Sequence, residues 1–126
     1  MIDRTQESER SGNDANVMLR RLSLPTHGVI ELVAGIVLIG LPFVLGFGPA
    51  ALLASAAAGA VLAGLGLSEG LSISAHMAAD TAVAAALLGG AVPLAATGET
   101  LAAGMLTAAA AGELTLGMAT RWTRAS

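Results

Sequence analysis

Residues 27–47 read HGVIELVAGIVLIGLPFVLGF, and residues 76–96 read HMAADTAVAAALLGGAVPLAA. Each segment opens with a histidine and places an acid four residues later, Glu31 after His27 and Asp80 after His76. The two histidines are 49 residues apart (76 − 27), and so are the two acids (80 − 31). A shared offset in a chain of 126 residues indicates two copies of one unit, each carrying a histidine and a carboxylate into an apolar run.

The composition around these segments is that of a membrane protein. Hydrophobic residues make up 55% of the chain and charged residues only 12%, whereas soluble domains usually carry about 25% charged residues. Four apolar blocks approach or reach the roughly 20 residues that a helix needs to cross a bilayer. They are residues 29–47, 49–67, 77–96 and 101–118. Because the blocks lack the alternation of barrel strands, we predict an all-α fold, a membrane four-helix bundle.

The bundle is predicted to consist of two tandem two-helix hairpin repeats, residues 25–72 and 73–122, within a transmembrane domain of residues 25–126. Turn residues at 46–49 and 97–100 make each pair of spans antiparallel. We therefore expect parallel repeats related by an axis along the membrane normal. Residues 1–24 are expected to form a polar, largely disordered cytoplasmic tail that ends in a short interfacial segment, residues 17–24.

Within the spans, prolines and small residues predict how the helices bend and pack. Pro42 and Pro93 lie late in the first and third spans, where proline kinks a helix. Thr26 is expected to cap the first span, and Ser72 or Ser74 the third. Small residues at four-residue intervals predict close packing of spans two and four. These are Ala56, Ala60 and Gly64, and Gly104, Ala108 and Gly112.

The basic residues predict the orientation in the membrane. All six are arginines outside the spans, and the loops between spans carry only acids. The positive-inside rule then places both termini in the cytoplasm. We expect four residues to anchor the bundle at the membrane interface. They are Arg20, Arg21, Arg121 and Trp122.

Several classes of chemistry are excluded or left without support. The absence of cysteine excludes disulfides and thiolate metal ligands. A net charge of −3 gives no reason to expect nucleic-acid binding. The chain has no phosphate-binding glycine loop, nucleophile elbow or dinucleotide fingerprint. We expect no enzyme activity and no cofactor.

The ionisable residues inside the spans form the candidate site. A helical rise of about 1.5 Å per residue places Glu31 and Asp80 roughly 6 Å inside the level of the histidines, and Glu113 on span four at a similar depth. Ionisable groups in lipid are costly and are functional candidates by default. The predicted intramembrane polar cluster is His27, Glu31, His76, Asp80 and Glu113.

Three interpretations of this cluster remain open. Two histidines and three carboxylates suit a metal such as Zn²⁺, Mn²⁺ or Fe²⁺, although the spacing does not identify the metal. The same groups suit a proton or cation relay in a small transporter. A purely structural interpretation pairs each acid with its histidine near a helix N-terminus. Glu113 lies near a helix C-terminus and needs a partner, which we expect to be His27, His76 or an arginine.

The segment from Pro25 to Phe47 resembles the first unit of the SPW repeat membrane proteins in His27, Glu31 and Gly35, followed by Pro42-Phe43 and Gly46-Phe47. The second unit resembles it in His76, Asp80, Pro93 and Gly98. The Ser-Pro-Trp tripeptide that gives the family its name is replaced by Leu41-Pro42-Phe43 and Val92-Pro93-Leu94. The first acid is glutamate where aspartate is expected. The resemblance implies paired two-helix units in a small bacterial membrane protein.

From these observations we expect a structural or interaction component of the bacterial inner membrane. The alternative is a proton- or cation-linked transporter or a metal-binding membrane subunit. The lipid bilayer is the expected partner, together with a second copy of the chain or a membrane partner protein.

Overall fold

The computed structural model describes residues 3–19 and 21–124, apart from the side chains of residues 13 and 15–19. Among the described residues, the regular structure is helical apart from an isolated parallel bridge between Leu22 and Thr120, and short turns and loops join the helices. The helices are α1 (Arg4–Leu19), α2 (Leu24–Leu45), α3 (Pro49–Gly66), α4 (Ile73–Ala96) and α5 (Thr100–Ala119). The predicted all-α class is confirmed.

The four helices α2 to α5 are each long and apolar enough to cross a membrane. They leave large apolar side chains on the outside of the bundle, with Val44 exposed to 82%, Leu53 to 70% and Val92 to 70%. Soluble proteins rarely expose so much contiguous apolar surface. Lipid is the solvent that these faces fit, so the protein is a membrane protein.

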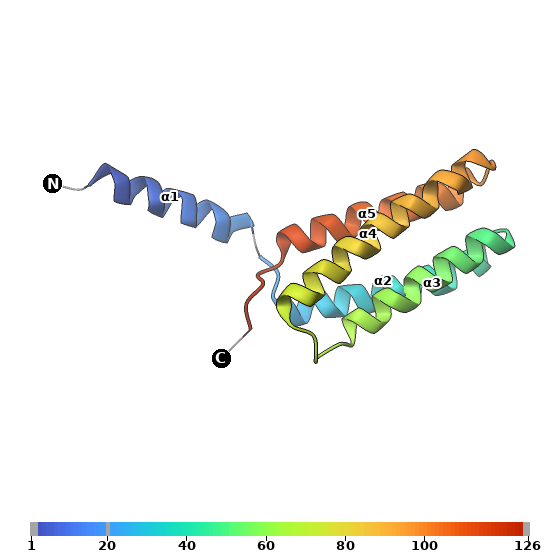
Figure 1. The fold of residues 1–126 in the computed structure, drawn as a ribbon, viewed down its shortest axis with the longest axis horizontal. Coiled ribbons are helices and arrows are strands. Elements are labelled where there is room, and N and C mark those ends of the chain that lie inside the picture. The colour runs from blue at the N-terminus through green and yellow to red at the C-terminus, as the bar shows by residue number, and fades with distance from the viewer. Residues whose placement is uncertain (1–2, 20, 125–126) are drawn as a thin grey trace.

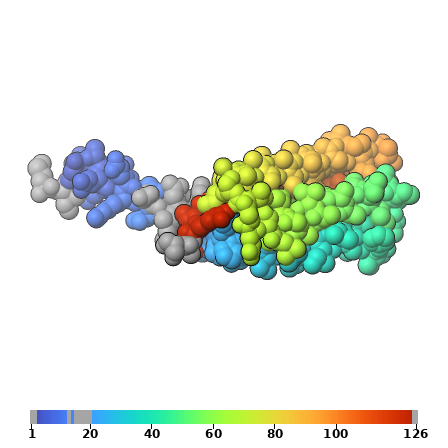
Figure 2. Space-filling model, turned by 60° about the horizontal axis from the view of Figure 1, so that its bottom comes forward, coloured from blue at the N-terminus to red at the C-terminus, as the bar shows by residue number. Residues whose placement is uncertain are grey.

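The helices are arranged as two hairpins, as predicted. Helix α2 packs chiefly against α3, and α4 packs chiefly against α5. Figure 1 shows that the start of α2 and the end of α5 lie at the same end of the bundle, from which α1 projects. In Figure 2, α3 and α4 lie side by side on one face, and the red C-terminal segment covers that same end. An even number of spans therefore brings both ends of the bundle to one side.

The first and third spans begin in the same way, at serine caps. The Ser23 side chain accepts a hydrogen bond from the Thr26 amide at the start of α2, and Ser72 accepts one from the Ala75 amide at the start of α4. The two serines are 49 residues apart (72 − 23), so the caps belong to the repeat. The prediction of Thr26 as a cap is wrong, because the helix begins two residues earlier at Leu24.

Both hairpins also turn in the same way at the opposite end. Gly46 and Gly98 adopt left-handed backbone conformations, with φ of 65° and 88°. The amide after each glycine donates to a carbonyl five residues earlier, Phe47 to Pro42 and Glu99 to Leu94. This is the Schellman motif, in which glycine avoids the strain of a side chain. Pro42 and Pro93 thus both lie in the final turns before a glycine stop.

The closest helix approach is in the first hairpin, and the predicted small-residue stripes do not make it. A Cβ added to Gly35 would lie 2.5 Å from the Gly59 carbonyl oxygen, and one on Gly59 would lie 2.5 Å from that of Gly35. By contrast, a Cβ on Gly64, Gly104 or Gly112 would meet nothing within 4 Å. The stripe prediction is wrong because four-residue spacing does not determine which face of a helix meets its neighbour.

The N-terminal region also differs from the prediction of a largely disordered tail, since residues 4–19 form α1. Asp3 begins this helix: its carbonyl accepts from the amides of Gln6 and Glu7, and its side chain accepts from the amide of Thr5. The predicted interfacial segment 17–24 is divided, because α1 ends at Leu19 and α2 begins at Leu24. The side chains of residues 17–20 lie outside the described part of the chain.

Candidate metal centre

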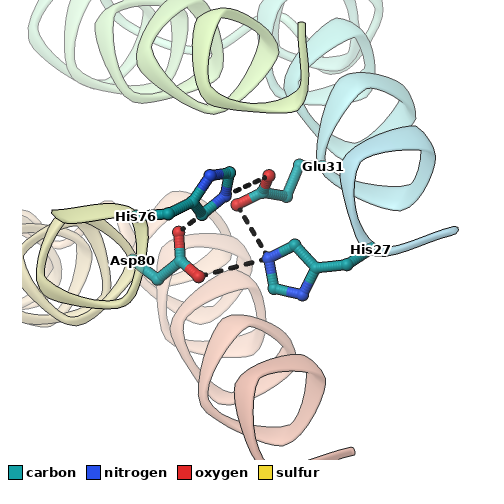
Figure 3. A group of neighbouring side chains, drawn as sticks. All are labelled: His27, Glu31, His76 and Asp80. Atoms are coloured by element: carbon teal, nitrogen blue, oxygen red, sulfur yellow. Dashed lines mark hydrogen bonds and ion pairs between the residues drawn. The ribbon is translucent and has the colours of Figure 1, made fainter. Parts of the chain in front are cut away.

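Four of the five predicted cluster residues meet where α2 and α4 begin. Figure 3 shows His27 and Glu31 from α2 pointing toward His76 and Asp80 from α4. His27 Nε2 lies 3.2 Å from Glu31 Oε1 and 3.1 Å from Asp80 Oδ2. His76 Nε2 lies 3.1 Å from Glu31 Oε2 and 3.5 Å from Asp80 Oδ1. The contacts form a closed ring of side chains in which histidines and carboxylates alternate.

The ring of four side chains is buried, and few of its polar atoms make hydrogen bonds. His27 and Glu31 are fully buried, while His76 and Asp80 are 8% and 6% exposed. Only the contact between His76 Nε2 and Glu31 Oε2 is a hydrogen bond. Four other buried atoms of the ring have no hydrogen-bond partner in the described chain: His27 Nε2, Glu31 Oε1, and Asp80 Oδ1 and Oδ2. Buried polar atoms are costly when left unpaired, so these atoms need another partner.

A hydroxyl group from α5 orients the His27 ring. Thr120 Oγ1 lies 2.8 Å from His27 Nδ1 and 2.6 Å from the Leu116 carbonyl oxygen. A hydroxyl has one hydrogen, and the carbonyl can only accept, so the hydroxyl donates to Leu116. Its oxygen therefore accepts from Nδ1–H of His27. In the neutral ring, the lone pair is then on Nε2, which faces the two carboxylates.

The segment after α5 covers the ring of side chains at the end of the bundle. The Trp122 ring lies 4.9 Å from the His27 ring and 6.0 Å from the His76 ring, measured between centroids. The Trp122 indole donates to the Gly117 carbonyl. The Arg124 guanidinium donates to the Leu71 carbonyl, in the loop between α3 and α4. The segment thereby links both hairpins and shields the site.

Backbone contacts hold this segment in place on the other side. The amide of Leu22 donates to the Ala119 carbonyl, and the amide of Arg121 donates to the Leu22 carbonyl. These bonds join the entry to α2 with the exit from α5. They fix Thr120 and Trp122 next to the histidines.

Glu113 is buried but is separate from the group of four. The ligand atoms of the other four residues lie within 4.8 Å of one another, and Glu113 is not among them. Glu113 is one of the residues that line a cavity between α2 and α5, and its buried Oε2 atom has no hydrogen-bond partner in the described chain. The partners expected for Glu113 from the sequence, a histidine or an arginine, do not pair with it in the described residues.

The predicted interface anchors have different positions in the structure. Arg20 lies outside the described residues, and the side chains of Arg21 and Arg121 are exposed. Trp122 is half-buried and packs on the histidines, a role that the sequence analysis did not anticipate. Thr120 was also missed, because a threonine at the end of an apolar span carries no pattern that indicates a hydrogen bond to a histidine 93 residues away.

Comparison with known proteins adds no further constraint on the site. The chain matches no protein-family model, no curated protein sequence and no solved structure.

Proposed function

We propose that this protein is a non-enzymatic structural component of the bacterial inner membrane, whose two hairpins are joined by one divalent metal ion. The first choice of ion is Zn²⁺, and Mn²⁺ or Fe²⁺ is the alternative. One observation carries the proposal: four buried ligand residues from both hairpins converge, and four of their converging atoms make no hydrogen bond.

The spacing of the ligand atoms supports a small coordination polyhedron. Zinc is bound by histidine nitrogen and carboxylate oxygen at about 2.0–2.2 Å, with tetrahedral geometry. Neighbouring ligands of such an ion are about 3.3 Å apart. The four contacts around the ring measure 3.1, 3.1, 3.2 and 3.5 Å. These contacts involve both oxygen atoms of each carboxylate. With one ligand atom from each residue, the four atoms lie within 4.8 Å of one another, so small movements of the side chains would bring them to the separation that a bound ion requires.

Charge balance supports a divalent cation at this depth. Two carboxylates contribute two negative charges, and neutral histidines contribute none, so a divalent ion makes the site neutral. A neutral site is much less costly in a membrane than an uncompensated pair of acids. The Thr120 contact leaves the Nε2 lone pair of neutral His27 directed at the site. Such outer contacts commonly orient metal-binding histidines.

A metal-free alternative is a ring of four alternating charges, with both histidines protonated. That arrangement is stabilised when each N–H is directed at an oxygen atom, since hydrogen bonds weaken steeply when bent. His27 Nε2 makes no hydrogen bond to either acid, although both are within 3.2 Å. This geometry favours an unprotonated Nε2 atom that binds a metal ion over a protonated histidine that donates to the carboxylates.

The number of ligands supports a structural role for the ion. Structural zinc sites are closed by four protein ligands, whereas catalytic sites keep one position for water or substrate. Here four protein ligands are available and Trp122 covers the two histidines. The absence of an open position is the reason for proposing a non-enzymatic protein.

The membrane and family assignments belong to the same proposal. The arginines before α2 and after α5 support cytoplasmic termini. Membership of the SPW repeat family is supported by four matched residues in each unit. They are His27, Glu31, Pro42 and Gly46 in the first, and His76, Asp80, Pro93 and Gly98 in the second.

Metal content tests the proposal directly. The full chain, without a polyhistidine tag, is purified into lipid nanodiscs, stripped with a chelator, incubated with Zn²⁺ and freed of excess ion. Elemental analysis is expected to give about one Zn²⁺ per chain. His27→Ala and Asp80→Asn are expected to lose the ion, because each removes a ligand from a different hairpin.

A matched control distinguishes the loss of a metal ligand from the loss of any acidic side chain. Glu69→Gln removes an exposed acid from the loop between α3 and α4, and it should leave the metal content unchanged. Circular dichroism of every variant checks that the helices are retained. If the stripped protein binds none of Zn²⁺, Mn²⁺ and Fe²⁺, or if the folded ligand variants bind as well as the parent, the proposed function is wrong.

A further inference from the structure

Glu113 is a buried acid that pairs with no basic side chain in the described chain. The residue is 5% exposed, and its Oε2 atom has no hydrogen-bond partner. Helices α2 to α5 contain no lysine or arginine. The two histidines face Glu31 and Asp80, and no ion pair joins Glu113 to a basic side chain among the residues that the structure describes.

Glu113 is one of the residues that line an apolar groove between the two hairpins. The groove has a volume of about 270 Å³ and lies between α2 and α5. It extends over Ile30 to Leu38 on α2, about 12 Å of helix at 1.5 Å per residue. On α5 the lining residues run from Met105 to Leu116, so Glu113 is near one end of the groove. Except for that acid, the lining side chains are apolar.

The composition of the groove decides which cations it fits. A calcium or magnesium ion takes six or more oxygen ligands, and the groove offers only the oxygen atoms of one carboxylate. The carbonyl groups of both helices are already used within the helices. An organic ammonium ion with an apolar body needs one acid and a hydrophobic surface, and the groove provides both.

We propose that this groove binds an alkylammonium ion, with the ammonium group paired to Glu113 and the alkyl chain along α2 and α5. The site is distinct from the ring of His27, Glu31, His76 and Asp80 and does not depend on a metal there. Because the lining residues include exposed ones, the ligand reaches the groove from the lipid phase.

Photolabelling in lipid nanodiscs tests this site. The probes are an octylammonium ion and 1-octanol, each with the same photoreactive diazirine in the alkyl chain. Peptides labelled by each probe are identified by mass spectrometry. The ammonium probe is expected to label α2 and α5 along the groove and to be displaced by excess unlabelled octylammonium. Glu113→Gln should reduce this labelling about tenfold or more, since hydrogen bonds to charged groups contribute about 1.5–3 kcal/mol.

Control probes and variants distinguish labelling that depends on the ammonium charge from labelling by probe that has only partitioned into the lipid. The alcohol probe should label the parent and the Glu113→Gln variant equally, and Glu113→Asp should retain most of the ammonium labelling. Circular dichroism of the same samples reports whether the fold is intact, whether or not the protein binds zinc, so the two proposals fail independently. Equal ammonium labelling of the parent and Glu113→Gln would show that Glu113 does not bind the ammonium group, and the inference would be wrong. Labelling outside the groove would also overturn it.

Discussion

At the scale of single residues, the His27 ring is fixed by one hydroxyl. The hydrogen bond from His27 Nδ1 to Thr120 Oγ1 decides which ring nitrogen faces the two acids. The second hydrogen bond, from Thr120 to the Leu116 carbonyl, decides the direction of the first. Thr120 is therefore a positioning residue for the proposed metal site, although it is not a ligand.

Replacing Thr120 tests this role. Thr120→Val keeps the shape of the side chain and removes the hydroxyl, so we expect Zn²⁺ affinity to fall by about 10–100-fold, as for other outer contacts of metal ligands. Thr120→Ser keeps the hydroxyl and should bind within a few-fold of the parent. Competition with a chelator of known affinity gives both values. Equal affinities of the valine variant and the parent would exclude a positioning role.

At the scale of the helices, the first hairpin depends on the close approach of α2 and α3 at Gly35 and Gly59. Ser55 strengthens the same contact, because its hydroxyl donates to the Leu38 carbonyl across the interface at 2.6 Å. Close backbone approach is one of the main sources of helix association in lipid. The second hairpin relies more on buried leucine and alanine side chains, such as Leu87, Leu106 and Ala110.

Two glycines of α3 form a matched pair for testing this contact. Gly59→Ala places a methyl group against the backbone of α2, so we expect a loss of about 1–3 kcal/mol of stability, the usual cost of overpacking. Gly64→Ala adds the same methyl group where nothing lies within 4 Å, and it should be neutral or stabilising. Reversible unfolding in mixed detergent micelles measures both. Similar losses in the two variants would contradict the assignment of the interface.

The sequence predicted the elements and most of the site, because those depend on local spacing. Four apolar blocks predicted four helices, and the interval from His27 to Glu31 and from His76 to Asp80 placed each pair on one helix face. The contact between the two pairs followed from the repeat. The glycine interface and the Thr120 contact could not be predicted, because they depend on the rotation and register of packed helices. Helix α1 was missed because its described side chains lack an apolar face.

At the scale of the whole molecule, the proposed ion joins two hairpins that otherwise contact each other much less than the helices within each hairpin do. One ligand pair comes from α2 and the other from α4, and the segment after α5 covers them. Binding that occurs only in the assembled bundle stabilises it by mass action, by about 2.7 kcal/mol at a free ion concentration one hundred times the dissociation constant.

The pH dependence of binding separates a metal site from a metal-free ring of charges. A metal requires unprotonated histidine nitrogens, and free histidine has a pKa of about 6.5, so metal binding releases protons. We expect Zn²⁺ affinity to decrease as the pH falls from 7.5 to about 5.5. A ring of charges with protonated histidines has the opposite sign, since its stability decreases as the pH rises. Calorimetric titration at several pH values measures the protons released, and a release of none contradicts the metal site.

The most direct test of the central claim is X-ray absorption spectroscopy of the zinc-loaded protein in lipid nanodiscs. We expect a first shell of about four nitrogen and oxygen atoms at about 2.0–2.1 Å, with the outer-shell scattering of two imidazole rings. The double variant His27→Ala/His76→Ala should retain no ion after the same loading and so give no zinc absorption edge above that of the buffer. A spectrum of an ion surrounded only by water and carboxylate oxygen, without imidazole, would contradict the claim that the two hairpins share one metal ion.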